Sequence, residues 1–288
     1  MKDIFDFKRF GKYFVTEIKG CIANYGLSII TISLLLYIIS YVMLVSVSLI
    51  TTSEWTGLGL GFRATLFITS LFSLVVTMPV KCYGKITEKQ AGSAFLTLPV
   101  SRLEKYVSML LMTVIIAPVT CIVLFLGLDT LICNIDKTCG SPLLTEISNL
   151  SSLIINLPKE IAYESAIGEI TAEVAKFIKQ MTNPWLYVDD IIGINLVFLL
   201  GAVWFKTGKT VKTMMAWTIF AIITSIVFTP LIEPWSKELL NATTAGDFEA
   251  IFQLSIFRHA ALIDTVNDTI VNIALFTAIW FRIKTLKH

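Results

Sequence analysis

The stretch LSIITISLLLYIISYVMLVSVSLI, residues 27–50, decides the class of this protein because it holds 24 consecutive residues without a charged side chain. A helix rises about 1.5 Å per residue, so about 20 apolar residues cross a hydrocarbon core about 30 Å thick. A backbone exposed to lipid must satisfy its hydrogen bonds within its own segment, which favours a helix. We therefore predict that residues 27–50 form a transmembrane helix.

Five further apolar blocks follow along the 288-residue chain, although the fourth and sixth blocks of the set are short. The six predicted spans cover residues 27–50, 57–80, 106–133, 190–205, 214–232 and 268–281. The chain as a whole is 55% hydrophobic and 15% charged, whereas a soluble domain has about 25% charged residues. This pattern predicts an all-α, polytopic membrane protein with six transmembrane helices.

Residues 1–26 are predicted to form an amphipathic helix on the membrane surface, because aromatic side chains recur at helical spacing beside basic ones. The residues assigned to this surface helix are Phe7, Lys8, Arg9, Phe10, Lys12 and Phe14. A basic extension of the first span is the alternative. The segment has no continuous apolar region of the kind a signal peptide needs, so we expect the first span to stay as an anchor.

The distribution of charge predicts the orientation of the spans. The N-terminal segment, residues 81–105, residues 206–212 and the C-terminal tail together hold 16 of the 23 basic residues but only 5 of the 21 acidic ones. Short cytoplasmic segments of membrane proteins carry such an excess of Lys and Arg. We therefore expect these four segments, and with them both termini, to be cytoplasmic.

The opposite side is expected to carry residues 134–189, the largest segment between spans, with a helix over residues 158–181. Arg63 is expected to reach the outer membrane surface from the second span, and Asp129 to face water at the outer end of the third. Cys133 and Cys139 also fall at that end. They can form a disulfide if that side is oxidising, or stay as two free thiols.

The span interiors carry no charged residue, which argues against a carrier coupled to protons or sodium ions. The two histidines have no neighbours at metal-ligand spacing, and no nucleophile motif is present. We therefore expect a protein that is not an enzyme, binds no cofactor itself and has no nucleic-acid partner.

Residues 81–105 form the longest predicted cytoplasmic loop. Residues 87–96 can form a short helix, which Leu98-Pro99 breaks because the residue before proline disfavours helical geometry. Ser101 is predicted to cap the next helix, and Glu104 stands three residues later, as a capping box requires. The chain thus presents a short helix on the cytoplasmic side before it enters the membrane as the third span.

Residues 95–105 read FLTLPVSRLEK. This motif resembles a segment that often lies between spans two and three in permease subunits of type-2 exporter ATP-binding-cassette (ABC) transporters. The six-span layout and the basic N-terminal helix agree with that family, although residues 134–189 form a larger external segment than many members have.

The resemblance implies a permease that dimerises with a second copy or a paralogue and binds separate ABC ATPase subunits, which carry ATP and Mg. It also implies location in a bacterial inner membrane, with the lipid bilayer as a further partner. The residues it assigns to the ATPase-coupling loop are Ile86, Glu88, Lys89, Ser93, Phe95, Leu98, Pro99, Ser101, Arg102 and Glu104.

Two alternatives stay open from the sequence. The coupling-loop residues can simply cap and orient the third span. The protein as a whole can be a polytopic membrane protein without transport activity, in which the external helical segment binds a ligand or partner. The transported substrate cannot be deduced from the polar residues of the spans.

Overall fold

The computed structural model describes residues 5–51, 54–88, 92, 93, 95, 97–149, 184–244 and 255–286, without the side chains of 184–186, 227–244 and 255–264. Within these residues all regular secondary structure is helical. The longer elements are α1 (Phe7–Thr51), α2 (Leu60–Tyr83), α4 (Arg102–Leu110), α5 (Ala117–Ile135), α8 (Pro184–Trp204), α9 (Lys209–Thr244) and α11 (Ser255–Thr285). The shorter ones are η1 (Gly84–Thr87), η2 (Leu111–Ile116) and η3 (Lys137–Cys139).

Five helices of the described part are long and apolar enough to cross a membrane. They cover Phe7–Thr51, Leu60–Thr87, Arg102–Ile135, Tyr187–Trp204 and Thr265–Thr285. The predicted span over residues 214–232 lies inside α9, but the side chains of its last residues are outside the described part, so this fifth of the six predicted spans stays a prediction. The predicted helix over residues 158–181 is also outside the described residues.

The lipid-facing character of these helices is visible in what they leave exposed. Leu35, Ile39, Val42, Met43 and Val47 of α1 are each between 47% and 62% exposed. A contiguous apolar surface of this kind is rare on a soluble monomer and typical of contact with a membrane or partner. The apolar helices therefore indicate an integral membrane protein, as the sequence predicts.

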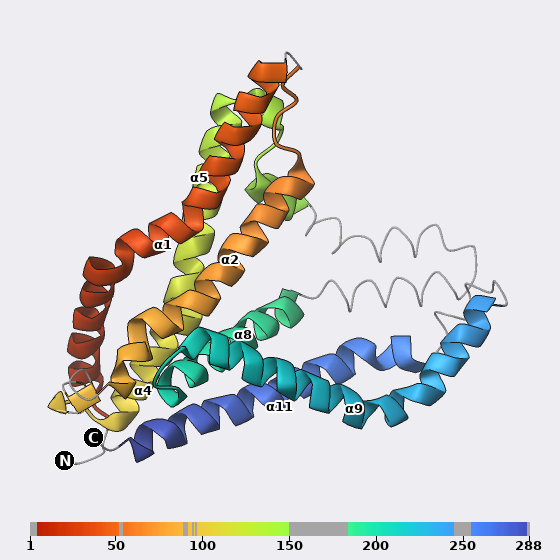
Figure 1. The fold of residues 1–288 in the computed structure, drawn as a ribbon. Helices are drawn as coiled ribbons and strands as arrows, with labels where there is room; N and C mark the ends of the chain where they lie inside the picture. The colour runs from red at the N-terminus through yellow and green to blue at the C-terminus, as the bar shows by residue number, and fades with distance from the viewer. Residues whose placement is uncertain are drawn as a thin grey trace. The chain divides into compact units, whose positions relative to one another are not determined.

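One uninterrupted helix, α1, contains both the predicted surface helix and the predicted first span. Figure 1 shows that α1 changes direction in its N-terminal half. The helix is continuous across residues 26 and 27. Placement of the N-terminal half on a membrane surface stays a prediction.

The described chain divides into two compact units. The first comprises Met1–Ile147, Ile194–Thr213 and Leu275–His288, and the second comprises Ser148–Gly193 and Met214–Ala274. In the first unit, α1, α2 and α5 pack together, as Figure 1 shows. Tyr37 of α1, Phe67 of α2 and Phe125 of α5 form the aromatic centre of this packing, with ring centroids 5.2 and 5.3 Å from Phe125.

In the second unit, Asn272 of α11 donates its side-chain amide to the carboxylate of Asp189 in α8, at 2.8 Å. The same amide nitrogen lies 3.2 Å from the Asp189 carbonyl oxygen. A side chain added at Gly193 would meet the Asn272 amide oxygen at 2.9 Å. A side chain at position 193 would therefore need the Asn272 amide to move.

The third predicted span is interrupted by a π-helical turn, η2, between α4 and α5. There the Ala117 N–H donates to the Met112 carbonyl, five residues back. The next residue, Pro118, has no N–H to continue the pattern, which leaves the Thr113 carbonyl without a helical donor. Asn195 of α8 donates its side-chain amide to that carbonyl at 2.7 Å. A buried polar side chain thus satisfies the backbone group that the π turn and the proline leave free.

Candidate functional site

The carboxylate of Glu104 joins the predicted coupling loop to the start of α1. Ser101 accepts a hydrogen bond from the Glu104 N–H at 3.2 Å, and Glu104 accepts one from the Ser101 N–H at 2.9 Å. The predicted capping box is therefore confirmed. The same carboxylate also accepts the Asp6 N–H at 2.8 Å and two guanidinium nitrogens of Arg9, at 2.7 and 2.9 Å.

The two ends of this ion pair differ in burial, since Glu104 is fully buried while the Arg9 side chain is 40% exposed. The hydrogen bonds from Ser101, Asp6 and Arg9 satisfy a carboxylate that would otherwise be costly to bury. Asp6 in turn accepts the N–H groups of Lys8 and Arg9 and so caps the first turn of α1. The start of α1 and the start of α4 are thereby fixed to each other.

A second acid, Glu17, fastens the next turns of α1 to α2 and α4. Tyr83, the last residue of α2, donates its hydroxyl to Glu17 at 2.5 Å. Ser108 of α4 donates its hydroxyl to the other oxygen of Glu17. Through Glu17, the N-terminal part of α1 is therefore bound to the end of α2, which precedes residues 84–101, and to α4, which follows them.

The short helix η1 contacts the turn between α8 and α9. Lys209 donates its ammonium group to the Gly84 carbonyl, and the Thr87 hydroxyl donates to the Phe205 carbonyl at 3.4 Å. A Cβ atom at Gly84 would lie 3.3 Å from the Lys209 side chain. The lysine thus crosses directly over the glycine backbone.

The end of α11 closes the assembly. Arg102 donates to the Lys284 carbonyl at 3.0 Å, and Tyr106 donates its hydroxyl to the Phe276 carbonyl at 2.9 Å. The ring of Tyr106 also packs on Trp280, at 5.4 Å between centroids. The C-terminal part of α11 therefore lies against the first turns of α4.

We call this assembly the junction; it comprises Asp6, Arg9, Glu17, Tyr83, Gly84, Thr87, Ser101, Arg102, Glu104, Tyr106, Ser108, Phe205, Lys209, Phe276, Trp280 and Lys284. It joins the four segments whose excess of basic residues predicts one common side of the membrane. The contacts place these segments at one end of the first unit. The side of the membrane itself stays a prediction.

The structure divides the predicted coupling residues into an inner and an outer set. Ile86, Ser101 and Glu104 are buried, and Phe95 is half-buried beneath the Lys105 ammonium group, 5.1 Å from its ring centre. The exposed residues are Glu88, Ser93, Leu98, Pro99 and Arg102. Lys89 lies outside the described residues, as does part of the predicted helix over residues 87–96.

The predicted surface-helix residues divide in a similar way. Phe7, Lys8 and Lys12 are exposed, with Phe7 83% exposed. Phe10 and Phe14 are half-buried and stacked, with ring centroids 5.5 Å apart. Arg9 alone of this set forms the ion pair with Glu104.

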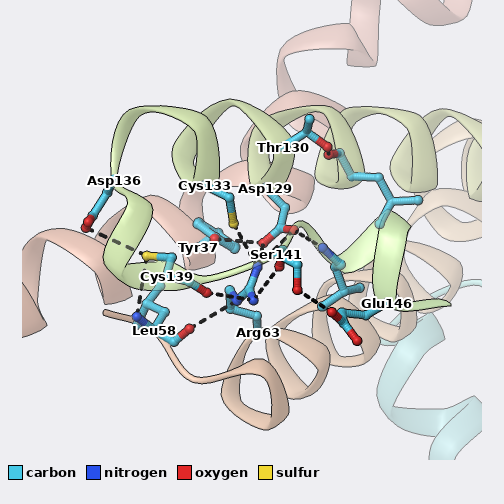
Figure 2. Close-up of polar contacts among 12 residues, drawn as sticks. Tyr37, Leu58, Arg63, Asp129, Thr130, Cys133, Asp136, Cys139, Ser141 and Glu146 are labelled. Carbon is cyan, nitrogen blue, oxygen red and sulfur yellow. Dashed lines mark hydrogen bonds and ion pairs between the residues drawn. The ribbon is translucent and has the colours of Figure 1, made fainter. Parts of the chain in front are cut away.

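The opposite end of the same helices holds a second polar cluster, which we call the Arg63 network (Figure 2). Arg63 of α2 and Asp129 of α5 form an ion pair at 3.0 Å, with 1% and 0% of the residues exposed. Asp129 also accepts the Tyr37 hydroxyl at 2.9 Å and the Leu143 N–H at 2.6 Å. Every oxygen of this buried carboxylate is therefore hydrogen-bonded.

The guanidinium group of Arg63 organises the loops around it. It donates to the carbonyls of Leu58, Cys139 and Ser141 at 3.1, 3.0 and 2.9 Å, and contacts the Cys133 sulfur at 2.9 Å. About 20 residues of α2 separate Arg63 from Tyr83, a length of about 30 Å. The Arg63 network and the junction are thus about one hydrocarbon thickness apart along that helix.

Asp136, just beyond α5, is the second acceptor of the Arg63 network. It accepts the Trp55 indole N–H at 2.7 Å, the Tyr41 hydroxyl at 2.9 Å and the Thr138 N–H at 3.1 Å. Hydrogen bonds from Thr138, and then from Trp55 and Tyr41, lower the pKa of Asp136 to about 2 against the opposing effect of burial.

The sequence-based expectations for Arg63 and Asp129 were wrong. Neither side chain reaches a membrane surface or water, because each is buried as the partner of the other. The signal that would have found them is their shared depth: each lies a few residues inside the same end of consecutive spans. An arginine and an aspartate at one level of neighbouring helices are expected to pair.

Cys133 and Cys139 are both buried free thiols in the structure. Arg63 donates to Cys133, and the Leu58 N–H donates to Cys139 at 3.5 Å. The disulfide between them stays a prediction.

In the described residues no group of three or more His, Cys, Asp or Glu side chains could hold a metal ion. Comparisons of the chain with protein-family models, with curated proteins and with solved structures found no match.

Proposed function

We propose that this chain is the membrane-spanning permease subunit of an ATP-driven ABC exporter, and that the segment over residues 84–105 docks a separate ATPase subunit. The observation that carries the proposal is the junction. A single short segment is fixed to the start of α1, the ends of α2 and α11, the turn before α9 and the start of α4. A partner bound to that segment would therefore act on most of the spans at once.

The two faces of the segment support this assignment. Ile86, Ser101 and Glu104 point into the first unit and serve as its anchors. Glu88, Leu98 and Pro99 are exposed and are left for a partner to contact. The proposal thus separates the residues implied by the FLTLPVSRLEK motif into anchors and docking residues.

The anchors are rigid enough to transmit a displacement. The bidentate contact between Arg9 and Glu104 has a charge on both sides, and such hydrogen bonds are about twice as strong as neutral ones. The capping box fixes the direction in which α4 leaves the segment. Movement of residues 84–101 would consequently move α1 and α4 together.

The proposal is tested by purification from native membranes. The docking variant Glu88→Lys with Lys89→Glu reverses two neighbouring charges of the 84–105 segment, and Phe95→Ala is prepared separately. The matched control is Lys137→Glu, which reverses an exposed charge near the Arg63 network.

The expected result is that the unaltered chain and Lys137→Glu retain a polypeptide carrying an ATPase P-loop, identified by mass spectrometry. The docking variant should retain at least about tenfold less of it, since reversal of charge at an interface costs about 1–3 kcal/mol or more. Thermal unfolding of each purified variant shows whether the fold is intact. Equal recovery of the ATPase with a folded docking variant would refute the proposal.

A further inference from the structure

Two cysteines from different helices lie against each other beside the junction. The sulfur atoms of Cys21 in α1 and Cys82 in α2 are 3.6 Å apart, although 61 residues separate them in the chain. Cys21 is 7% exposed and Cys82 is half-buried. Either thiol can donate a hydrogen bond to the other.

The contact between these thiols is held in register by the neighbouring side chains. Cys21 follows Glu17 by four residues and so lies on the same face of α1. Cys82 directly precedes Tyr83, whose hydroxyl donates to Glu17 at 2.5 Å. The bond between Glu17 and Tyr83 therefore aligns the helices at the level where the two sulfur atoms meet.

The other cysteines have different surroundings. Cys121 is fully buried and contacts the Ser70 hydroxyl at 3.7 Å. Cys133 and Cys139 belong to the Arg63 network, at the other end of α2. Cys21 and Cys82 therefore differ from the other cysteines, since in the described hydrogen bonds their sulfur atoms contact each other and join two long helices.

We propose that Cys21 and Cys82 form a reversible disulfide, which makes this pair an oxidation site that links α1 to α2. In the first step, one thiolate attacks hydrogen peroxide, the O–O bond breaks, and a sulfenic acid and hydroxide form. The second thiolate then attacks the sulfenic sulfur and expels a second hydroxide. The two thiol protons convert both hydroxides to water, so two thiols and one peroxide give one disulfide and two waters.

The disulfide would add a covalent bond to a connection that is otherwise made by hydrogen bonds. Cys82 lies two residues before η1, and Cys21 lies one turn beyond Glu17. Oxidation would therefore fix the N-terminal half of α1 to the root of the 84–105 segment. If the proposed function holds, the oxidised segment would also no longer move when an ATPase binds. Only this consequence rests on the proposed function.

The disulfide is tested on the full chain purified in lipid nanodiscs, without any partner. The chain is treated with hydrogen peroxide or with dithiothreitol, then unfolded, and its free thiols are labelled with a maleimide and counted by mass. Cys133 and Cys139 are replaced by serine in this experiment, which leaves three of the five cysteines, so the expected count falls from three to one on oxidation and returns to three on reduction. Trypsin then releases residues 82–85, CYGK, attached through Cys82 to the peptide that contains Cys21.

Cys21→Ser and Cys82→Ser are the matched variants, and neither should give a disulfide-linked peptide through the remaining cysteine of the pair. Cys121 is the internal control, since it should stay unpaired. The proposal is overturned if peroxide yields no peptide linking Cys21 to Cys82. It is also overturned if that peptide forms only after the chain is unfolded. Because no ATPase is present, neither result bears on the proposed docking function.

Discussion

The ion pair between Arg63 and Asp129 yields the sharpest prediction for stability. Asp129→Asn keeps the shape of the side chain but removes the negative charge beside the guanidinium group of Arg63, a residue that is 1% exposed. Arg63→Met removes the other partner and leaves a buried carboxylate. Removing one member of a buried ion pair costs about 3–5 kcal/mol, because the remaining charge is uncompensated.

The double variant, Arg63→Met with Asp129→Leu, should cost much less than the two single changes together. No buried charge is left, and replacement of a buried pair by apolar side chains is often close to neutral. The carbonyls of Leu58, Cys139 and Ser141 still lose the Arg63 donor, at about 1 kcal/mol each. We therefore expect the double variant to be about as stable as either single one, with a coupling energy of about 3 kcal/mol or more.

The assay is reversible unfolding in mixed micelles by titration with SDS, followed by tryptophan fluorescence. Trp55 donates to Asp136 in the same network and reports on its loss. Thr65→Val, a change at an exposed position two residues from Arg63 along α2, is the control and should change the unfolding free energy by less than about 0.5 kcal/mol. Additive effects of the two single changes, or single costs below about 1 kcal/mol, would refute the assignment of a buried pair.

Three further predictions follow from other parts of the structure. Asn195→Leu should destabilise the chain by about 1–3 kcal/mol, because it leaves the Thr113 carbonyl unpaired. In a Pro118→Ala background a helical N–H is restored, so the same change should cost at least about 1 kcal/mol less. A double-mutant cycle measures this difference. The lowered pKa of Asp136, about 2, stabilises the fold by about 1–2 kcal/mol at pH values above its ordinary pKa of about 3.9. That contribution should be lost as the pH falls from about 4 to 2, and the loss of stability measured over this range should be smaller by about 1–2 kcal/mol in Asp136→Asn. A reporter fused to the C-terminus should read as cytoplasmic, and an external reading would refute the topology.

The sequence predicts the helices well because the bilayer imposes a simple requirement on them. The predicted spans over residues 27–50, 106–133 and 268–281 lie within helical parts of the structure, and those over residues 57–80 and 190–205 overlap α2 and α8. The capping box of Ser101 and Glu104 is also a local pattern and can be read directly. Boundaries shift by a few residues, as at α2, because hydropathy marks the apolar stretch rather than the hydrogen-bonded ends.

The tertiary contacts could not be read from these patterns. Arg63 and Asp129 were interpreted one helix at a time. On an isolated helix, a charged side chain can contact only water or the membrane surface, so their ion pair was missed. Besides capping α4, Glu104 pairs with Arg9. No local pattern predicts this pair, because the two residues lie 95 positions apart in the chain. Asn195 matters through the π turn and Pro118 of another helix, a backbone irregularity that hydropathy does not reveal.

The most direct test of the docking proposal is site-specific photo-crosslinking from residue 88. A photoreactive amino acid replaces Glu88 in cells that hold the chain in its native membrane. In the control it replaces Lys137, near the Arg63 network. We predict a cross-link from position 88 to a polypeptide that is itself labelled by a photoreactive ATP analogue, and none from position 137. If position 88 gives no cross-link to an ATP-binding polypeptide while the chain is folded in the membrane, the proposed role as an ATPase-docking permease is contradicted.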